Sequence, residues 1–440
     1  MSFPRYPEYK GSGVEWLGDV PAHWRVARLS AVLREVADVG DDDLPILSVS
    51  IHEGISDREL GESELDRKVT RSDDRSKYKR VEAGDLVYNM MRAWQGGFGA
   101  VQVRGQVSPA YVVARPINDL PAWYIELALR TPNAVEEMRR HSRGVTDFRL
   151  RLYWEEFKTL VVPFPPAVDR VAIATFLDRE TAKIDALIAE QEKLITLLQE
   201  KRQAVISHAV TKGLDPNVPM KDSGVEWLGE VPAHWDRIQL GRACHKIADG
   251  PHFSPTYVDD GVLFLSARNI RVDGWQLDDA KYVSEKDYQE FCRRITPQKG
   301  DVLYTKGGTT GIARVVDLDS KFQVWVHVAV LKIAKDVADP HFTAYALNSI
   351  GCYEQSQLHT RGATNQDLGL TRMVKIWMAH PPVLEQVRIV QYLDHETAKM
   401  DVLVDDVKRA ADLLKERRAA LISAAVTGQI DVRSLAAEPE

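Results

Sequence analysis

Residues 12–18 read SGVEWLG, and residues 223–229 read SGVEWLG again, 211 positions later. The match continues into VPAHW, which stands at residues 20–24 and at residues 231–235. Self-similarity at a fixed offset marks a duplicated structural unit and outweighs any single motif in predicting a fold. The chain is therefore predicted to contain two copies of one framework.

A second pair of repeated stretches extends this framework. Residues 177–185 read LDRETAKID and residues 393–401 read LDHETAKMD, 216 positions later. The same offset relates the Pro-Pro pairs at 165–166 and 381–382, and the AVT stretches that begin at Ala209 and Ala425. The two kinds of repeat alternate along the chain.

The stretches between these repeats, residues 25–164 and 236–380, match each other poorly. Only fragments agree, such as GDLVY from Gly84 with GDVLY from Gly300, and RGVT from Arg143 with RGAT from Arg361. A shared framework that holds two diverged inserts favours two modules that read different targets. The alternative is a duplicated scaffold whose domains drifted apart without separate roles.

A domain organisation follows from these boundaries. It comprises an N-terminal conserved segment at 1–24, a first globular domain at 25–164, a central conserved region with a long helix and the repeated SGVEWLG segment at 165–235, a second globular domain at 236–380, and a C-terminal conserved region with a long helix at 381–440.

Each Pro-Pro pair is predicted to precede a long helix, because proline suits a chain that enters a helix. After the pair at 165–166 no other proline follows until Pro216, which leaves room for about 45 helical residues. Positions in steps of four and three form a stripe typical of a coiled-coil seam. In the first copy the stripe comprises Ile184, Ile188, Gln191, Ile195, Leu198, Arg202 and Val205, and in the second Met400, Val404, Val407, Ala411, Leu414, Arg418 and Leu421.

Two such stripes in one chain can bury each other, so an antiparallel coiled coil with a pseudo-twofold repeat is predicted. A helix of about 40 residues is roughly 60 Å long, more than one turn of DNA at about 34 Å, and could act as a ruler between two readers. The alternative is a packing helix without a measuring role. Arg202 and Arg418 occupy the same seam position, either as paired register-setting charges or on a hydrated flank.

Composition sets further bounds. A chain of 440 residues exceeds what one core usually supports, and its net charge of −7 argues against indiscriminate coating of DNA. No stretch is apolar enough to span a membrane and the N-terminus lacks a secretory signal, so a cytoplasmic protein without membrane contact is expected. Cys244, Cys292 and Cys352 are isolated, which predicts reduced thiols without a disulfide or a metal site.

The two globular domains combine short apolar runs and glycines, typical of strands and turns, with helical patterns at 122–138 and 342–358. The predicted fold class is α+β, with two small mixed α/β domains. Loop side chains that suit base edges are candidate DNA contacts. They are Asn89, Arg92, Gln95, Arg143, Thr146 and Arg149 in the first domain and Lys306, Thr309, Thr310, Arg361, Asn365 and Gln366 in the second.

A basic stretch from Arg67 to Arg80 includes Lys77, Lys79 and Arg80 and is a candidate phosphate contact, with a hydrated surface turn as the alternative. No catalytic residue is predicted, because the GxxxxGK[ST] phosphate loop and the Asn-Pro-Pro-Tyr type of methyltransferase motif are absent from the sequence. His23 and His234 lack partner ligands at metal-binding spacing, so packing or capping is expected of them. Asp169 and Asp178 are expected on a solvated helix face.

The chain resembles the specificity subunits of Type I restriction-modification systems over nearly its whole length. In the second copy the resemblance rests on PPVLEQVRI from Pro381, Leu393-Asp394 with KMD from Lys399, and AVTGQI from Ala425. In the first domain GDLVYNMMR from Gly84 and SPAY from Ser108 are similar to one type of target recognition domain. The first copy departs from the pattern, since it reads Val168-Asp169-Arg170-Val171 where the second copy has Glu385-Gln386-Val387.

This resemblance implies that each domain reads one part of a split, asymmetric target in double-stranded DNA. It implies that the repeated helices and segments dock two modification (methyltransferase) subunits and, through them, restriction (motor and nuclease) subunits. S-adenosylmethionine, ATP and Mg would then belong to those partners, and this chain would bind no cofactor. The main alternative is a coiled-coil scaffold that displays two domains for ligands other than DNA, and a third is an enzyme with an unrecognised site.

Overall fold

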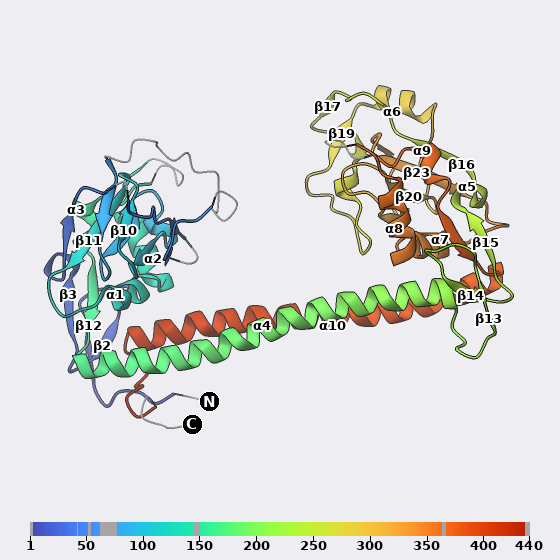
Figure 1. Ribbon diagram of the computed structural model, residues 1–440. Helices are drawn as coiled ribbons and strands as arrows, with labels where there is room; N and C mark the ends of the chain where they lie inside the picture. The colour runs from blue at the N-terminus through green and yellow to red at the C-terminus, as the bar shows by residue number, and fades with distance from the viewer. Residues whose placement is uncertain are drawn as a thin grey trace. The chain divides into compact units, whose positions relative to one another are not determined.

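The computed structural model describes residues 3–41, 43–51, 54–61, 77–144, 150–362 and 367–435. The chain forms two compact units (Figure 1). Unit 1 combines Met1–Glu190 with Ala410–Glu440, and unit 2 is Gln191–Arg409. Each unit therefore holds one diverged insert together with parts of both long helices.

The elements of the first half run up to and include the first long helix. They are β1 (Tyr9–Gly11), β2 (Asp19–Pro21), β3 (Arg25–Arg28), β4 (Leu33–Val36), β5 (Val49–Ser50), β6 (Gly54–Ile55), β7 (Lys79–Val81), β8 (Leu86–Asn89), β9 (Phe98–Ala100), β10 (Gly105–Val107), β11 (Tyr111–Pro116), α1 (Ala122–Leu129), α2 (Pro132–His141), α3 (Trp154–Phe157), β12 (Val161–Phe164) and α4 (Ala167–Lys212).

The second half contains a similar series. Its elements are β13 (Met220–Asp222), β14 (Glu230–Pro232), β15 (Asp236–Gln239), α5 (Leu240–Ala243), β16 (Cys244–Asp249), β17 (Tyr257–Val258), β18 (Val262–Leu265), β19 (Lys281–Val283), α6 (Glu285–Cys292), β20 (Val302–Thr305), β21 (Ala313–Val315), β22 (Phe322–Val324), β23 (Val328–Ile333), α7 (Pro340–Leu347), α8 (Ile350–His359), α9 (Leu370–Met373), β24 (Trp377–His380) and α10 (Val383–Val426).

The central sheets of the two domains have the same topology. The first has the order β4-β11-β8-β9 and the second the order β16-β23-β20-β21, and all neighbouring strands in both sheets are antiparallel. The β1–β2 pair corresponds to β13–β14, and the β3–β12 pair to β15–β24. The mixed α+β class predicted for both domains is confirmed. Each diverged insert has its own central sheet, and the two sheets have the same topology.

The repeated GDLVY and GDVLY fragments have a structural explanation. Gly84 and Gly300 have φ values of 91° and 90°, in the left-handed region that favours glycine. The following side chains, Asp85 and Asp301, accept hydrogen bonds from backbone N–H groups three residues earlier, at 2.9 and 2.7 Å. These fragments form the turns that begin β8 and β20, which explains why they persist in otherwise diverged domains.

Each predicted helix at 122–138 and 342–358 is in fact two helices. The chain is extended at Thr131 and at Ser349, between α1 and α2 and between α7 and α8. In the first domain the cause is Pro132, because a residue before proline avoids the helical region. Ser349 takes the extended conformation common at a helix N-cap.

The two long helices confirm the lengths predicted from the proline spacing, with 46 residues in α4 and 44 in α10. All fourteen predicted seam positions are buried or half-buried. Ile184 of α4 and Leu421 of α10 belong to the core of unit 1, whereas Ile206 of α4 and Ile389 of α10 belong to that of unit 2. The predicted stripe is therefore the packed face of both helices.

The paired charges on the seam occur in both copies. Arg202 of α4 forms an ion pair with Asp401 of α10, and Arg418 of α10 pairs with Asp185 of α4 at 2.8 Å. Because these side chains are between 22% and 50% exposed, they lie on the hydrated flank of the seam while still bonding across it.

The start of α4 corrects the expectation of a solvated Asp169, which is 3% exposed. Its Oδ2 bonds His23 Nε2 at 2.7 Å and accepts from Trp24 Nε1 at 2.6 Å. In the second copy Glu385 at the equivalent position bonds His234 at 2.9 Å, and the Trp235 Nε1 has no partner among the described residues. The repeated Pro-Ala-His-Trp segments thus fasten each domain to a long helix. The expected packing or capping role of the histidines is corrected, because both are exposed and each bonds a carboxylate in the first turn of a helix.

The next residue differs between the copies but serves the same purpose. Buried Arg170 donates to the Asp119 carboxylate at 2.6 Å, whereas fully buried Gln386 accepts from Asp339 N–H at 2.8 Å and donates to the Pro381 carbonyl at 2.8 Å. The Glu385-Gln386 pair and its Asp169-Arg170 counterpart therefore both attach the first turn of a helix to its domain.

Candidate nucleic-acid interface

Two segments of the second domain that contain predicted DNA contacts lie together. The turn after β20 begins at Lys306, and the segment after α8 runs from Arg361 to Asp367. Arg361 and Gly307 both form antiparallel bridges with Asp367, and Leu368 N–H donates to the Lys306 carbonyl at 2.8 Å. These backbone contacts bring Arg361 close to the turn after β20, which contains Lys306, Thr309 and Thr310.

The first domain brings together the equivalent segments. Arg143 bridges Arg151 after α2, and Leu152 N–H donates to the Met90 carbonyl in the turn after β8, at 2.8 Å. The turn after Asn89 and the segment at Arg143 and Arg151 therefore meet in the same way as their counterparts in the second domain.

Several predicted residues offer accessible side chains. Gln95, Thr309, Arg361 and Lys77 are exposed, and Arg92 is half-buried beside Gln95. The Arg143 side chain is 74% exposed and forms an ion pair with Glu156. Four predicted residues lie outside the described part of the chain, and they are Thr146, Arg149, Asn365 and Gln366.

Three predicted residues are buried, which corrects their assignment as groups that reach base edges. Asn89 is 4% exposed, and its Oδ1 accepts from Met91 N–H at 3.0 Å. Lys306 is 4% exposed and paired with acids, while Thr310 is 6% exposed. Their loop positions suggested contact with DNA, but the short turns fold these side chains inward.

Of the basic stretch, the described residues serve local structure. Lys79 Nζ donates to the Tyr111 carbonyl at 2.7 Å, and Arg80 pairs with Asp38 and Glu82 at 3.7 and 3.4 Å. The part of the stretch from Arg67 to Ser76 lies outside the described residues.

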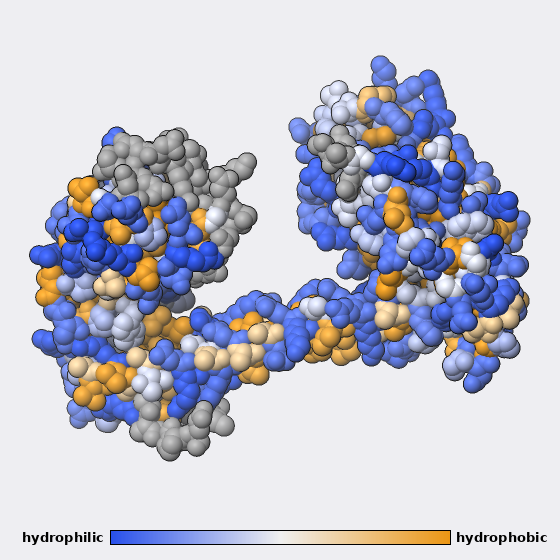
Figure 2. Space-filling model, viewed as in Figure 1, coloured by the Kyte–Doolittle hydropathy of each residue, from blue (hydrophilic) through white to orange (hydrophobic). Residues whose placement is uncertain are grey.

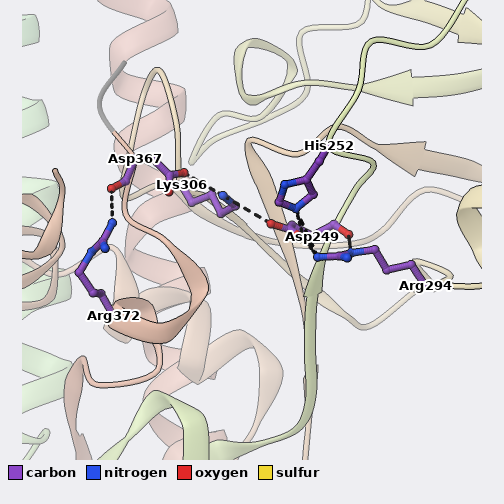
Figure 3. A network of polar contacts seen from close by, with 6 residues as sticks. All are labelled: Asp249, His252, Arg294, Lys306, Asp367 and Arg372. Atoms are coloured by element: carbon purple, nitrogen blue, oxygen red, sulfur yellow. Dashed lines mark hydrogen bonds and ion pairs between the residues drawn. The ribbon is translucent and has the colours of Figure 1, made fainter. Parts of the chain in front are cut away.

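A polar network in the second domain surrounds the buried carboxylate of Asp249, at the end of β16 (Figure 3). Its Oδ1 bonds Arg294 and lies 3.3 Å from His252 Nε2, and its Oδ2 lies 3.5 Å from Lys306 Nζ. Lys306 Nζ also donates to the Asp367 carboxylate at 2.8 Å. Sequence reasoning missed Asp249, His252 and Arg294, because no repeat or spacing relates these three residues.

The electrostatics of the network extend to His327, whose ring lies beside Gly307. A Cβ on Gly307 would come within 2.2 Å of His327 Nδ1, so only glycine fits there. Burial, followed by the nearby Lys306 ammonium, lowers the pKa of His327 below its ordinary value. The loop is therefore packed tightly against the sheet at this point.

A separate pocket of about 640 Å³ lies in unit 1, and none of the predicted DNA contacts lines it. Its lining includes Arg5, Trp16, Asn133, Thr427 and Gln429. In the described part of the chain, His, Cys, Asp and Glu side chains form no group that could hold a metal ion. Nor does any described helix have a stretch long and apolar enough to cross a bilayer.

Comparison with known proteins adds to this geometry. Residues 272–402 match the family model of the Type I restriction modification DNA specificity domain. The specificity subunit of the EcoBI Type I restriction enzyme of Escherichia coli is 21% identical over 287 residues, which span 64% of this chain and 60% of that relative. The match thus covers less than two thirds of the relative's length.

Solved structures resemble the fold. One chain, from a study of complex assembly in a type I restriction-modification system, superposes with a TM-score of 0.66 at 16% identity, and the match covers 92% of this chain and 98% of that one. The HsdS subunit from Thermoanaerobacter tengcongensis gives a TM-score of 0.49 at 16% identity, with 93% and 98% covered.

Proposed function

Because residues 272–402 match the family model of the Type I restriction modification DNA specificity domain, we propose that the chain is a Type I restriction-modification specificity subunit and that it recognises a bipartite, asymmetric DNA target without catalytic chemistry of its own. One observation carries this proposal. Two domains with the same sheet order present loops at the same place but with different side chains. Such a pair suits two readers that recognise different base sequences through one kind of interface.

We further propose that α4 and α10 pack as an antiparallel coiled coil with pseudo-twofold symmetry and set the spacing between the two readers. The reciprocal pairs Arg202–Asp401 and Arg418–Asp185 support this packing. At 1.5 Å per residue, helices of 46 and 44 residues are each roughly 65–70 Å long, about two turns of DNA.

The helices also offer a surface for two copies of one partner, which we propose to be the modification subunit. Four apolar positions are exposed on α4 and again 216 residues later on α10, and Figure 2 shows hydrophobic residues exposed along these helices. The pairs are Val168 with Leu384, Val171 with Val387, Leu187 with Leu403, and Leu197 with Leu413. Restriction subunits would join through the modification subunits, and S-adenosylmethionine, ATP and Mg would be bound by these partners.

The test of recognition is to map methylated positions in DNA from cells that express this chain with its modification partner. We expect two short sequences with a fixed spacer, and a chain with residues 236–380 exchanged for another second domain should alter only one of them. Methylation that does not depend on this chain, or a single continuous target, would contradict the proposal. Purified alone with Mg and DNA, the chain should neither cut nor methylate.

The ruler is tested by inserting one heptad at equivalent positions of both α4 and α10. Seven residues add about 10 Å, close to three base pairs, so the spacer should lengthen while both half-sites stay the same. If the DNA target keeps its original spacer length but its bases change, the long helices do not set the spacing. The alternative of a scaffold without a DNA role predicts no salt-dependent binding to duplex DNA, whereas recognition predicts affinity that falls steeply with salt.

A further inference from the structure

We propose that Arg294 is a DNA phosphate contact of the second domain, held in place by the buried Asp249 and linked through Lys306 to the candidate recognition loop. This inference rests on the proposed function, since it names a contact of the same interface. Its evidence is the network in Figure 3, which joins four separate segments of the domain.

The Arg294 side chain is held in one orientation by Asp249. Its Nε donates to the Asp249 carbonyl at 2.9 Å, and its Nη2 donates to the Asp249 carboxylate. The Asp249 side chain is 2% exposed, whereas that of Arg294 is 48% exposed. A guanidinium held along one edge by a buried acid is oriented before any ligand arrives, which reduces the entropy cost of binding.

Part of the Arg294 guanidinium remains available to a ligand. Among the described residues, no protein acceptor is assigned to Arg294 Nη1, while Nη2 lies 3.4 Å from His252 Nε2 in addition to its bond with Asp249. Bidentate reading of guanine requires two parallel donors. One open N–H end suits a single phosphate oxygen instead.

The network around Asp249 carries more cationic than acidic side chains. The network contains two acids, Asp249 and Asp367, and three cationic side chains, Lys306, Arg294 and Arg372, whose guanidinium donates to the Asp367 carbonyl. The exposed His252 lies beside Arg294. Even with a neutral imidazole the cluster keeps a positive excess, and a DNA phosphate is the anion that lies next to any base-reading loop.

Lys306 is a positioning residue, because it links Asp249 to Asp367. Its Nζ bonds Asp367, which forms a backbone bridge with Arg361, and lies 3.5 Å from Asp249. The Asp249 carboxylate therefore connects a phosphate contact to the loop that carries the predicted base contacts. A phosphate contact fixed relative to such a loop sets its register on the duplex.

The first domain lacks this arrangement. Strand register places Ala37 at the position of Asp249, since Val36 pairs with Val113 as Ala248 pairs with Val330. Met90 stands at the position of Lys306, because its carbonyl accepts the equivalent loop hydrogen bond. Among the described residues the arrangement is therefore present in the second domain and not in the first, so its effect should be confined to the second half-site.

The test compares the full chain with Arg294→Gln, Arg294→Lys and the matched control Arg293→Gln. Arg293 is the adjacent residue at the end of α6, 78% exposed and paired with Glu290 of that helix at 2.7 Å. For Arg294→Gln we expect a uniform affinity loss of about three- to tenfold across sequences, and a salt slope smaller by about one. Arg294→Lys should retain most of the slope, and Arg293→Gln all of it.

Methylphosphonate links, which neutralise one phosphate at a time, then locate the contact. The unmodified chain and Arg293→Gln should lose affinity at one phosphate of the second half-site, where Arg294→Gln should show no further loss. An unchanged salt slope in Arg294→Gln, or a loss confined to one base pair, would overturn this inference and leave the proposed function standing. If the chain selects no DNA sequence at all, the proposed function itself fails.

Discussion

Asp169 shows how one buried carboxylate fastens a domain to a long helix. One of its oxygens bonds both His23 Nε2 and Trp24 Nε1, at 2.7 and 2.6 Å, in a site where it is 3% exposed. Glu385 at the equivalent position is 30% exposed in its side chain and bonds only His234. The same junction is thus bonded more strongly in unit 1 than in unit 2.

We predict that Asp169→Asn destabilises unit 1 by about 2 kcal/mol, because the buried Trp24 Nε1 donor and the His23 ring lose a charged acceptor that is itself buried. Glu385→Gln, the matched change in the second copy, should cost less than about 1 kcal/mol because its ion pair is solvated. Urea unfolding of both variants measures the difference. Equal losses would show that burial of Asp169 does not strengthen the junction.

Two cysteines provide a second test at this scale. Burial raises the pKa of the Cys244 thiol and of the Cys352 thiol to about 12. At pH 8 the reactive thiolate should then be about 10³-fold rarer than for an ordinary thiol, whose pKa is about 8.5. Iodoacetamide should label both slowly in the folded protein and rapidly in urea, as measured by peptide mass spectrometry. Fast labelling of the folded protein at either site would contradict this pKa shift.

Residue roles were the hardest feature to predict from the sequence. Lys306 and Asn89 stand in glycine-flanked loops and carry suitable donors, yet the fold buries both. Burial depends on which distant segments pack together, and the Asp249–Arg294 contact joins residues 45 positions apart without any local pattern. Local sequence therefore located the loops but not the direction of each side chain.

At the scale of elements, the long helices were predicted well because their signal is local and repeated. Steps of three and four residues between apolar positions determine which face of a helix is buried, and all fourteen seam positions lie on that face. The order of the strands could not be predicted, since β4 pairs with β11 across most of the first domain. Short strands carry little information about their distant partners.

The seam charges provide a test of helix register. Arg202→Ala should cost less than about 1 kcal/mol, because the ion pair with Asp401 is partly exposed. Asp401→Arg should cost more, since two like charges would then meet, and combining it with Arg202→Asp should restore most of the stability. Urea unfolding measures each variant, and Arg409→Ala, which removes a pair with Asp406 within one helix, is the control. No recovery in the double variant would contradict the pairing.

At the scale of the whole molecule, the two units differ in continuity. Unit 2 is one uninterrupted stretch, Gln191–Arg409, whereas unit 1 needs Ala410–Glu440 in addition to Met1–Glu190. Leu421, Ala425 and Val426 of α10 lie in the core of unit 1. Only unit 2 therefore has its core within a single uninterrupted segment.

We predict that a fragment of residues 191–409 unfolds cooperatively when it is expressed alone. A fragment of residues 1–190 should instead bind the dye ANS and melt broadly, because the α10 side chains are missing from its core. The two fragments are compared by circular dichroism melts and by ANS fluorescence. Addition of residues 410–435 to the fragment of residues 1–190 should sharpen its melting transition. Equally cooperative melting of both fragments would contradict the division into these units.

The return of α10 to unit 1 has a consequence for synthesis. A ribosome releases the chain from its N-terminus, and domains generally fold as they emerge. Unit 2 can close as soon as residue 409 has left the exit tunnel, but the backbone hydrogen bond from Asp431 to Pro4, at 2.8 Å, forms only later. The part of this protein that is translated first is therefore completed last, and the apolar core of unit 1 stays incomplete until residues 410–435 have been synthesised.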